Sequence, residues 1–417
     1  MRYVVIGSCI AAMGAVEGIR STDRQGSITL IDGEQRGAYS RPLISYYLAQ
    51  PYKYKDISYR SPEFLTANGV EVLNAMAVQI NQNGQEVVLQ NGRTIPYDRL
   101  LIATGASPVI PDIPGIQKSW VKTFYTLADA ESLNNLLTEG QEALIIGSGL
   151  IGMKAAEALW QRGLKVSIIE KESHILPRVL NPGSAAVINT LLQGTGIKIR
   201  CNEELTAVLP EHQVEFASGL SLPADLLILA LGTRPRTELA TDCGLAINKG
   251  IDVNQYLQST DENIYAAGDV IASNNLLNGA KEVMALLPQA HQEGYLAGCN
   301  MAGERRAYAG GIFQNSVNIL GTSICSAGSL INSHYTSMVW QQDNKYLELF
   351  IGEGCLYKYI AINLPEIAGP LTTATERKIG IEENAWRLFM DSPSLSAIPP
   401  VYWHKIGDIP RANAWNQ

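Results

Sequence analysis

The chain opens with a short apolar run, Tyr3 to Ile6, which ends at a glycine and leads into a segment of helical composition, Ala11 to Arg20. A second β-branched run, Ser27 to Ile31, ends on an acidic residue, Asp32. Short continuous apolar runs beside a helix are typical of parallel strands that are covered on both faces. The pattern therefore predicts a β-α-β unit.

The turn inside this unit, Gly7 to Ala12, follows the spacing Gly-x-Gly-x-x-Ala, except that Cys9 occupies the middle glycine position. Such turns hold a dinucleotide pyrophosphate, because the helix N-terminus offers free N–H groups and the positive end of its dipole. A cysteine is small, so it narrows this site without abolishing it. Taken alone, the pattern also fits an ordinary buried β-α-β unit with a glycine turn.

A second copy of the pattern strengthens the dinucleotide interpretation. The apolar strand Glu142 to Ile146 runs into Gly147-x-Gly149-x-x-Gly152, and the next predicted strand ends on Glu170. This acid follows the turn by roughly 20 residues, the usual place of a carboxylate that binds ribose hydroxyls. The sequence therefore predicts two dinucleotide sites.

The acid of the second copy bears on which nicotinamide nucleotide binds. Glu170 can accept hydrogen bonds from the ribose 2′- and 3′-hydroxyls, whereas it would repel a 2′-phosphate. Lys171 and Arg178 are near enough in the sequence to soften that repulsion. NAD is therefore expected at this site in preference to NADP.

Composition narrows the class of protein. A chain of 417 residues suits two or three domains, and its net charge of -8 argues against a nucleic-acid surface. The six cysteines form no Cys-x-x-Cys pair, which excludes a thioredoxin-type centre and a recognisable zinc or iron–sulfur site. Cysteines scattered singly suit a reducing cytosol.

No segment predicts membrane insertion. The apolar N-terminus is interrupted by Glu17 and Arg20, which argues against a secretory signal, and the apolar stretch Ala143 to Trp160 contains Lys154 and Glu157. We expect a soluble, cytoplasmic protein with no membrane span.

Three further segments carry a family resemblance. Tyr39 to Ser45 resembles the Tyr-x-Arg-Pro-x-Leu-Ser signature of FAD-dependent pyridine nucleotide-disulfide oxidoreductases, in the rubredoxin and ferredoxin reductase branch that lacks a redox disulfide. Asp98 to Gly105 resembles the family's Asp-x-Leu-x-x-Ala-Thr-Gly strand, and Thr260 to Val270 resembles its Thr-x-x-x-Ile-Tyr-Ala-x-Gly-Asp segment.

The resemblance implies an α/β fold with two Rossmann-like, three-layer dinucleotide-binding domains, the NAD domain being inserted in the FAD domain, and an α+β C-terminal domain. The expected boundaries are 1–112 and 236–306 for the FAD domain, 113–235 for the NAD domain and 307–417 for a C-terminal domain of the interface or dimerisation type. Its aromatic tail beyond Ser392, with Tyr402, Trp403 and Trp415, either packs on its own domain or docks a partner.

The resemblance also implies site residues. Glu34, with Asp32 as the alternative, is expected at the adenosine ribose of FAD, and Arg41 near the flavin unless it only forms a surface salt bridge. The residues expected to hold FAD are Gly7, Cys9, Ala11, Ala12, Asp32, Glu34, Arg41, Pro42, Ala77, Val78, Ala103, Thr104, Gly105, Gly268, Asp269 and Leu287. Those expected to hold NAD are Gly147, Gly149, Leu150, Ile151, Gly152, Glu170 and Gly232.

The sequence departs from the family at a lysine–glutamate pair that many relatives place near flavin N5. Tyr46 stands at the lysine position and Lys154 at the glutamate position. We hypothesise that the Lys154 ammonium tunes the flavin; the alternative is a lysine on the helix surface. No cysteine follows between Gly33 and Arg60, and Cys9 is interpreted as structural.

These features predict an NAD(P)H-dependent FAD oxidoreductase that exchanges hydride between nicotinamide and flavin and serves a one-electron partner. The expected partner is a rubredoxin-like or iron–sulfur carrier, or an iron–sulfur subunit of a larger complex, for example of the tungsten or molybdenum aldehyde oxidoreductase type. Two alternatives are a stand-alone reductase of a small acceptor such as a quinone or oxygen, and a non-catalytic assembly subunit.

Overall fold

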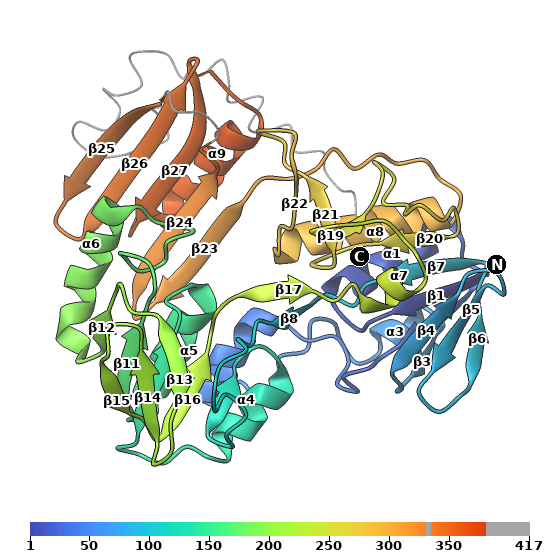
Figure 1. The fold of residues 1–417 in the computed structure, drawn as a ribbon. Helices are drawn as coiled ribbons and strands as arrows, with labels where there is room; N and C mark the ends of the chain where they lie inside the picture. The colour runs from blue at the N-terminus through green and yellow to red at the C-terminus, as the bar shows by residue number, and fades with distance from the viewer. Residues whose placement is uncertain (331–334, 381–417) are drawn as a thin grey trace.

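The computed structural model describes residues 1–330 and 335–380. Figure 1 shows them as three parts, each built around one large sheet. The first part holds a five-stranded parallel sheet in the order β20-β7-β1-β2-β3. Its strands are β1 (Arg2–Ile6), β2 (Ser27–Ile31), β3 (Val70–Leu73), β7 (Arg99–Ile102) and β20 (Ile264–Ala266).

Two helices of the first part, α1 (Ile10–Thr22) and α8 (Leu287–Met301), pack against each other very closely. Glycines make this approach possible: a Cβ at Gly14 would collide with the carbonyl oxygen of His291, and one at Gly294 with that of Ala11. The contact brings the N-termini of both helices to the same cavity, which is lined by Ile10 and Leu287.

A three-stranded antiparallel sheet completes the first part, and its Val87 and Leu89 join the same apolar core. The Asn-Gly turn at Gly92, where φ is +82°, connects its last two strands as the sequence predicts. The strands are β4 (Ala77–Asn81), β5 (Glu86–Leu89) and β6 (Thr94–Pro96). The remaining helices of residues 41–67 are η1 (Arg41–Leu43), α2 (Ile44–Ala49) and α3 (Phe64–Ala67).

The second part is inserted between β7 and β20, two strands that pair in the first sheet. Its own parallel sheet has the order β12-β11-β10-β16-β9, and α5 (Leu150–Gln161) packs on it. The strands are β9 (Val121–Thr123), β10 (Glu142–Ile146), β11 (Lys165–Ile169), β12 (Lys198–Arg200) and β16 (Leu226–Leu229). The smaller elements of this part are α4 (Leu127–Asn134), α6 (Pro182–Leu192), η2 (Gln193–Thr195), β13 (Leu205–Val208), β14 (Gln213–Phe216) and β15 (Ser221–Pro223).

Two antiparallel segments, β8 (Ala106–Pro108) and β17 (Thr233–Pro235), carry the chain into and out of the insertion. The chain then returns to the first part through α7 (Glu238–Asp242), β18 (Ile247–Asn248), β19 (Gly250–Asp252), β21 (Ile271–Asn274) and β22 (Lys281–Glu282). The predicted insertion of one nucleotide domain in the other is confirmed.

The third part is an antiparallel sheet in the order β23-β24-β27-β26-β25, with α9 (Pro365–Glu376) packed on it. Its strands are β23 (Gln314–Ile319), β24 (Thr322–Gly328), β25 (Thr336–Gln342), β26 (Lys345–Gly352) and β27 (Cys355–Ile362). The predicted α+β class of this part is confirmed. The aromatic tail beyond Ser392 lies outside the described residues.

Among the described residues, none of the helices has both the length and the apolar character that a membrane crossing requires.

Candidate functional site

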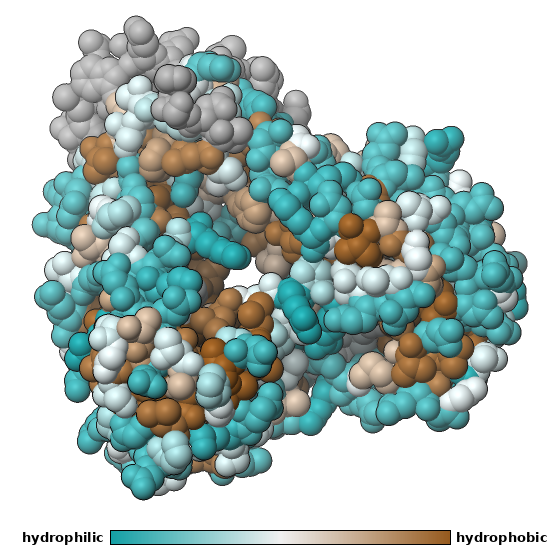
Figure 2. Space-filling model, in the orientation of Figure 1, coloured by the Kyte–Doolittle hydropathy of each residue, from teal (hydrophilic) through white to brown (hydrophobic). Residues whose placement is uncertain are grey.

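A large cavity of about 1180 Å³ lies where the three parts meet, and Figure 2 shows the hollow between them. Residues of the first part form one side, the start of α5 another, and β23 with α9 a third. Fifteen of the residues predicted to hold FAD line it: Gly7, Cys9, Ala11, Asp32, Glu34, Arg41, Pro42, Ala77, Val78, Ala103, Thr104, Gly105, Gly268, Asp269 and Leu287. Segments far apart in the sequence thus converge on one site.

The first glycine turn forms part of the wall. Gly7 has a φ of +113°, and a Cβ there would collide with the carbonyl oxygen of Ala103. The Ser8 hydroxyl is buried and has no hydrogen-bond partner within the described residues. Ala12, which was expected to hold FAD, is instead fully buried in the apolar core of the first part and does not line the cavity.

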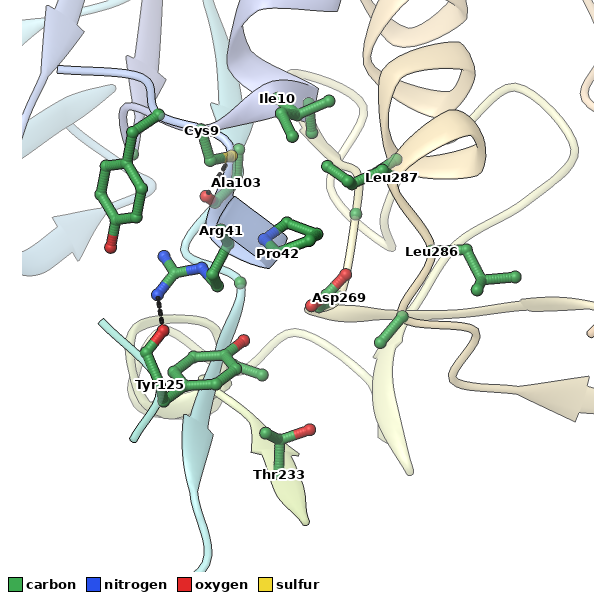
Figure 3. Close-up of a pocket in the computed structure, with 18 of the residues that line it drawn as sticks. Cys9, Ile10, Arg41, Pro42, Ala103, Tyr125, Thr233, Asp269, Leu286 and Leu287 are labelled. Carbon is green, nitrogen blue, oxygen red and sulfur yellow. Dashed lines mark hydrogen bonds between the residues drawn. The ribbon is translucent and has the colours of Figure 1, made fainter. Parts of the chain in front are cut away.

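Cys9 is the N-cap residue of α1, with extended backbone angles of φ -136° and ψ -178°. Its thiol donates to the carbonyl oxygen of Ala103 at 3.3 Å, as Figure 3 shows. Burial raises the pKa of the thiol, which stays neutral near pH 7. Cys9 is the only cysteine among the cavity residues of the described chain, so no dithiol pair is available there.

The two acids that follow β2 have different environments. Asp32 is 2% exposed and accepts hydrogen bonds from the backbone N–H groups of Glu34, Gln35 and Gly37, at 2.8 to 3.1 Å. Asp32 therefore shapes its own loop. Glu34 also lines the cavity, and its carboxylate accepts from the Tyr39 hydroxyl at 2.7 Å.

Arg41 extends across the cavity wall. Its guanidinium pairs with Glu34 at 3.0 Å, donates to the Tyr125 carbonyl at 3.1 Å and lies over the rings of Tyr39 and Tyr125. Burial opposes ionisation of Glu34, but Arg41 and the Tyr39 hydroxyl outweigh it and lower the pKa of that carboxyl. Arg41 and Glu34 thus form a salt bridge, and both residues line the cavity.

A second pair of acids lies beside the N-terminus of α8. Burial raises the pKa of Asp269, which lines the cavity (Figure 3). Glu293, on α8, is 2% exposed and accepts from the backbone N–H of Gly268 at 2.9 Å. Burial raises the pKa of Glu293 to about 8, and this hydrogen bond offsets the shift only in part.

Lys154 is not a lysine of the solvent-facing helix surface. Its side chain is 14% exposed and lines the cavity, with its ammonium 4.4 Å from the centre of the Tyr46 ring. It forms an ion pair with Glu157 and donates to the backbone carbonyl of Asn318 at 3.0 Å. The pair ties α5 to β23 at the cavity.

The second glycine turn lies mostly outside the cavity, although Leu150 and Ile151 reach it. A Cβ at Gly147 would collide with the Ala230 carbonyl, and one at Gly152 with the Gly147 carbonyl, whereas Gly149 faces open space. Gly232, with a φ of +95°, directly precedes β17 and does not line the cavity.

Glu170 lies at the end of β11, buried to 6% exposure. Its carboxylate accepts from the backbone N–H and the hydroxyl of Ser148 at 2.7 and 2.5 Å, and from the N–H of Glu172 at 2.9 Å. The carboxylate therefore lies beside the turn, where a ribose would be held, and is already hydrogen-bonded to it.

Several cavity residues were not predicted. They include Ser8, Tyr125, Arg236 and, from the third part, Gln314 to Asn318, Tyr359 and Thr372. Ser8 stands inside the glycine motif and was detectable from its position. The others come together only through the folded arrangement of the three parts.

The cavity fits a flavin dinucleotide. The glycine turn presents a helix N-terminus that no side chain caps, and the unpartnered Ser8 hydroxyl lies beside it. Arg41 and Arg236 supply cationic groups for a pyrophosphate or ribityl chain. The second turn likewise leaves α5 without a side-chain cap. Fold and site together define an oxidoreductase that uses a flavin and a nicotinamide dinucleotide.

Comparisons with known proteins agree with this class. Residues 1–294 match the model of the family described as pyridine nucleotide-disulphide oxidoreductase, and the chain belongs to that family. The cofactors of this chain are FAD and NAD(H), and the chain is an NAD(P)H-dependent oxidoreductase.

The match to this chain covers different shares of the length of each relative. The chain is 30% identical, over 87% of its length and 88% of the relative's, to the NADH-dependent phenylglyoxylate dehydrogenase subunit epsilon of Aromatoleum evansii. It is 29% identical to the assimilatory nitrate reductase electron transfer subunit of Bacillus subtilis (strain 168), over 81% of the chain and only 44% of that protein.

Among solved structures, a NAD-dependent persulfide reductase from A. fulgidus has a TM-score of 0.85 and is 26% identical, over 92% of this chain and 78% of that one.

Proposed function

We propose that the chain takes hydride from NADH and delivers the electrons singly to an iron–sulfur or rubredoxin-like carrier, or to an iron–sulfur subunit of a larger complex. One observation carries the proposal: the predicted FAD residues and the start of α5, from the second dinucleotide turn, line the same cavity. Two dinucleotides held by these motifs would meet there. The names of the two relatives, an electron transfer subunit and a dehydrogenase subunit, support a role inside an assembly.

Different residues would hold FAD and the nicotinamide nucleotide. Gly7, Ser8 and Arg41 would hold the pyrophosphate side of FAD, and Glu34 its adenosine ribose, while Asp32 shapes the loop that carries Glu34. Gly149 and Glu170 would hold the nicotinamide nucleotide by its pyrophosphate and ribose. FAD, when bound, supplies chemistry that accepts two electrons together and releases them one at a time.

Other residues of the cavity would exclude water and supply charge. Leu150, Ile151 and Leu287 give the cavity apolar walls that keep water from the reacting atoms. Lys154 presents a positive charge, partly balanced by Glu157, to the cavity where reduction adds negative charge. No described pair of cysteines relays the electrons, so they leave from the flavin site itself.

The overall reaction balances without a further reductant. One NADH gives NAD+, one proton and two electrons, and two one-electron carriers each accept one of those electrons.

The test is to purify the full chain anaerobically, record its absorbance and add NADH. A flavin spectrum that NADH bleaches, with turnover only when a one-electron carrier or a copurified iron–sulfur protein is present, supports the proposal. Rapid turnover with quinone or oxygen and no partner would favour the stand-alone reductase instead. A chain without flavin would favour the assembly subunit.

A further inference from the structure

The loop that follows α2, Gln50 to Asp56, presents an exposed aromatic ring, Tyr52, followed by two cations, Lys53 and Lys55. We call it the Tyr-Lys loop. Tyr52 is 97% exposed, and Lys53 and Lys55 are also exposed. An exposed large ring of this kind gains nothing for the stability of the chain, because it buries almost no surface.

The base of the Tyr-Lys loop lies close to the cavity. Tyr46 lines the cavity, and its ring centre is 5.4 Å from that of Tyr54. Tyr54 is half-buried and packs against the core of the second part. A molecule seated on the loop would thus be separated from the cavity by these two rings.

The loop is preformed. The carbonyl oxygen of Gln50 accepts hydrogen bonds from the N–H groups of Lys53 at 3.0 Å and Tyr54 at 3.1 Å. The Lys53 ammonium lies 5.3 Å from the centre of the Tyr54 ring, which holds the charge near the loop. A partner would therefore bind without first ordering this backbone.

The charge of the loop opposes that of the whole chain. The chain carries a net charge of -8, whereas the loop contains two lysines and one acid, Asp56, whose carboxylate accepts from the Ser58 N–H at 2.9 Å. Neither Lys53 nor Lys55 forms an ion pair within residues 1–330 and 335–380. An exposed aromatic ring next to unpaired cations suits an anionic protein surface.

We propose that the Tyr-Lys loop is the docking surface for an acidic one-electron carrier protein. This rests on the proposed function, because it identifies where the carrier of that reaction binds. A long nucleic acid or an anionic membrane would also meet the acidic remainder of the surface, whereas a small carrier with one acidic patch contacts the loop alone.

The first experiment measures the local field with small acceptors of opposite charge. NADH oxidation by the FAD-loaded protein is followed at about 10 mM salt, where screening is weak, with anionic hexacyanoferrate(III) or cationic hexaammineruthenium(III), two of either ion being reduced per NADH. Reversing both charges, with Lys53→Glu and Lys55→Glu, is expected to lower kcat/KM about fivefold for the anion and raise it for the cation.

A matched control reverses two exposed lysines elsewhere, with Lys198→Glu on β12 and Lys345→Glu on β26. It makes the same change in net charge and is expected to leave the ratio of the two rates within about twofold of the wild type. If both double variants shift the ratio equally, or neither does, the docking proposal is overturned while the proposed function stands. A wild type that oxidises no NADH with either ion overturns both.

A binding measurement tests the loop without turnover. An acidic [2Fe–2S] ferredoxin is titrated into the FAD-loaded protein by calorimetry at the same salt. Charge reversal of Lys53 and Lys55, and separately Tyr52→Ala, are each expected to weaken the Kd about tenfold, whereas the control pair does not. The Tyr52→Ala variant keeps the small-ion rates, because it removes no charge. Equal Kd values for all variants, or no binding by the wild type, contradict the proposal.

Discussion

The two glycine turns share a backbone plan but use their acids differently. In both, a strand ends on a buried carboxylate, Asp32 or Glu170. Asp32 binds the backbone of its own loop, whereas Glu170 binds Ser148 inside the turn. Only the first copy adds a further acid, Glu34, that lies against the cavity. In the proposed assignment, the first site therefore divides loop shape and ligand contact between two residues, whereas the second uses one residue for both.

The turns differ again at their middle position. Gly149 and Cys9 are both extended N-cap residues. The Cys9 thiol points to the Ala103 carbonyl, while the space beside Gly149 is open. A cysteine is therefore tolerated in the first turn because its sulfur has an acceptor.

The largest effect is expected from alanine at the first glycine of each turn. In Gly7→Ala and Gly147→Ala the new Cβ would collide with a neighbouring carbonyl, at φ values of +113° and +100°. Each is expected to cost more than about 3 kcal/mol of stability. Gly7→Ala should lose bound FAD, and Gly147→Ala should keep it but lose reduction by NADH, as absorbance spectra would show.

Gly37→Ala is the control, because its φ is +69° but no atom lies within 4 Å of the new Cβ. It isolates backbone strain, about 1 kcal/mol, from collision. Equal losses in Gly37→Ala and Gly7→Ala would show that the close approach to Ala103 is unimportant.

The next largest effect is expected from a difference between two buried acids, Glu157 and Glu293. Glu157 is paired with Lys154, whereas Glu293 forms no ion pair within the described residues and burial raises its pKa to about 8. The folded state therefore holds a proton that the unfolded state releases near pH 4.5. Because the folded state binds this proton more tightly, protonation of Glu293 stabilises the fold. This contribution to the free energy of unfolding is present in full below pH 4.5 and is lost as the pH rises through about 8.

Glu293→Gln is expected to remove this pH dependence. Between pH 5.5 and 8.5 the wild type should lose a few kcal/mol that the variant keeps, measured as the fall in Tm. Glu172→Gln, at an exposed carboxyl, is the control and should follow the wild type. Parallel Tm curves for the wild type and Glu293→Gln would show that Glu293 is ionised at neutral pH.

Some of these features could be predicted from the sequence, and others could not. The parallel strands and both glycine turns were predictable, because the spacing of apolar residues, of glycines and of the acids that follow the strands is a local signal. The insertion was expected only from the family resemblance. The contact of Lys154 with Asn318 was not predictable, since Asn318 lies 164 positions away and its carbonyl meets the ammonium only after the third part folds onto α5. Tyr125 and Arg236 join the cavity in the same way, without any motif of their own.

A smaller effect tests the middle position of the second turn. Gly149→Val introduces a side chain into open space at a φ of -65°, so Tm and FAD content should not change. The new side chain would keep a pyrophosphate from the backbone, and we expect the KM for NADH to rise about tenfold. Cys9→Gly is the counterpart and should alter FAD affinity less than threefold, or about 0.6 kcal/mol. An unchanged KM in Gly149→Val would mean that the nucleotide pyrophosphate binds elsewhere.

The Glu170→Gln variant tests whether one acid can both accept hydrogen bonds from the turn and bind a ribose. The amide keeps an acceptor for Ser148 but loses the negative charge, so discrimination against a 2′-phosphate should weaken. We expect the ratio of kcat/KM for NADH over NADPH to fall about fivefold, about 1 kcal/mol. Asp32→Asn, which changes the loop acid of the first copy, should leave this ratio unaltered.

The smallest effect concerns Lys154, because Glu157 already balances part of its charge. Lys154→Met keeps the length of the side chain and removes the ammonium that faces the cavity. Reduction adds negative charge there, so losing the cation should lower the two-electron flavin potential by about 15 mV, or about 0.7 kcal/mol. Lys154→Arg retains the charge and should retain the potential, which separates electrostatics from the contact with Asn318. If Lys154→Met leaves the potential of the titrated flavin unchanged, the lysine only joins α5 to β23.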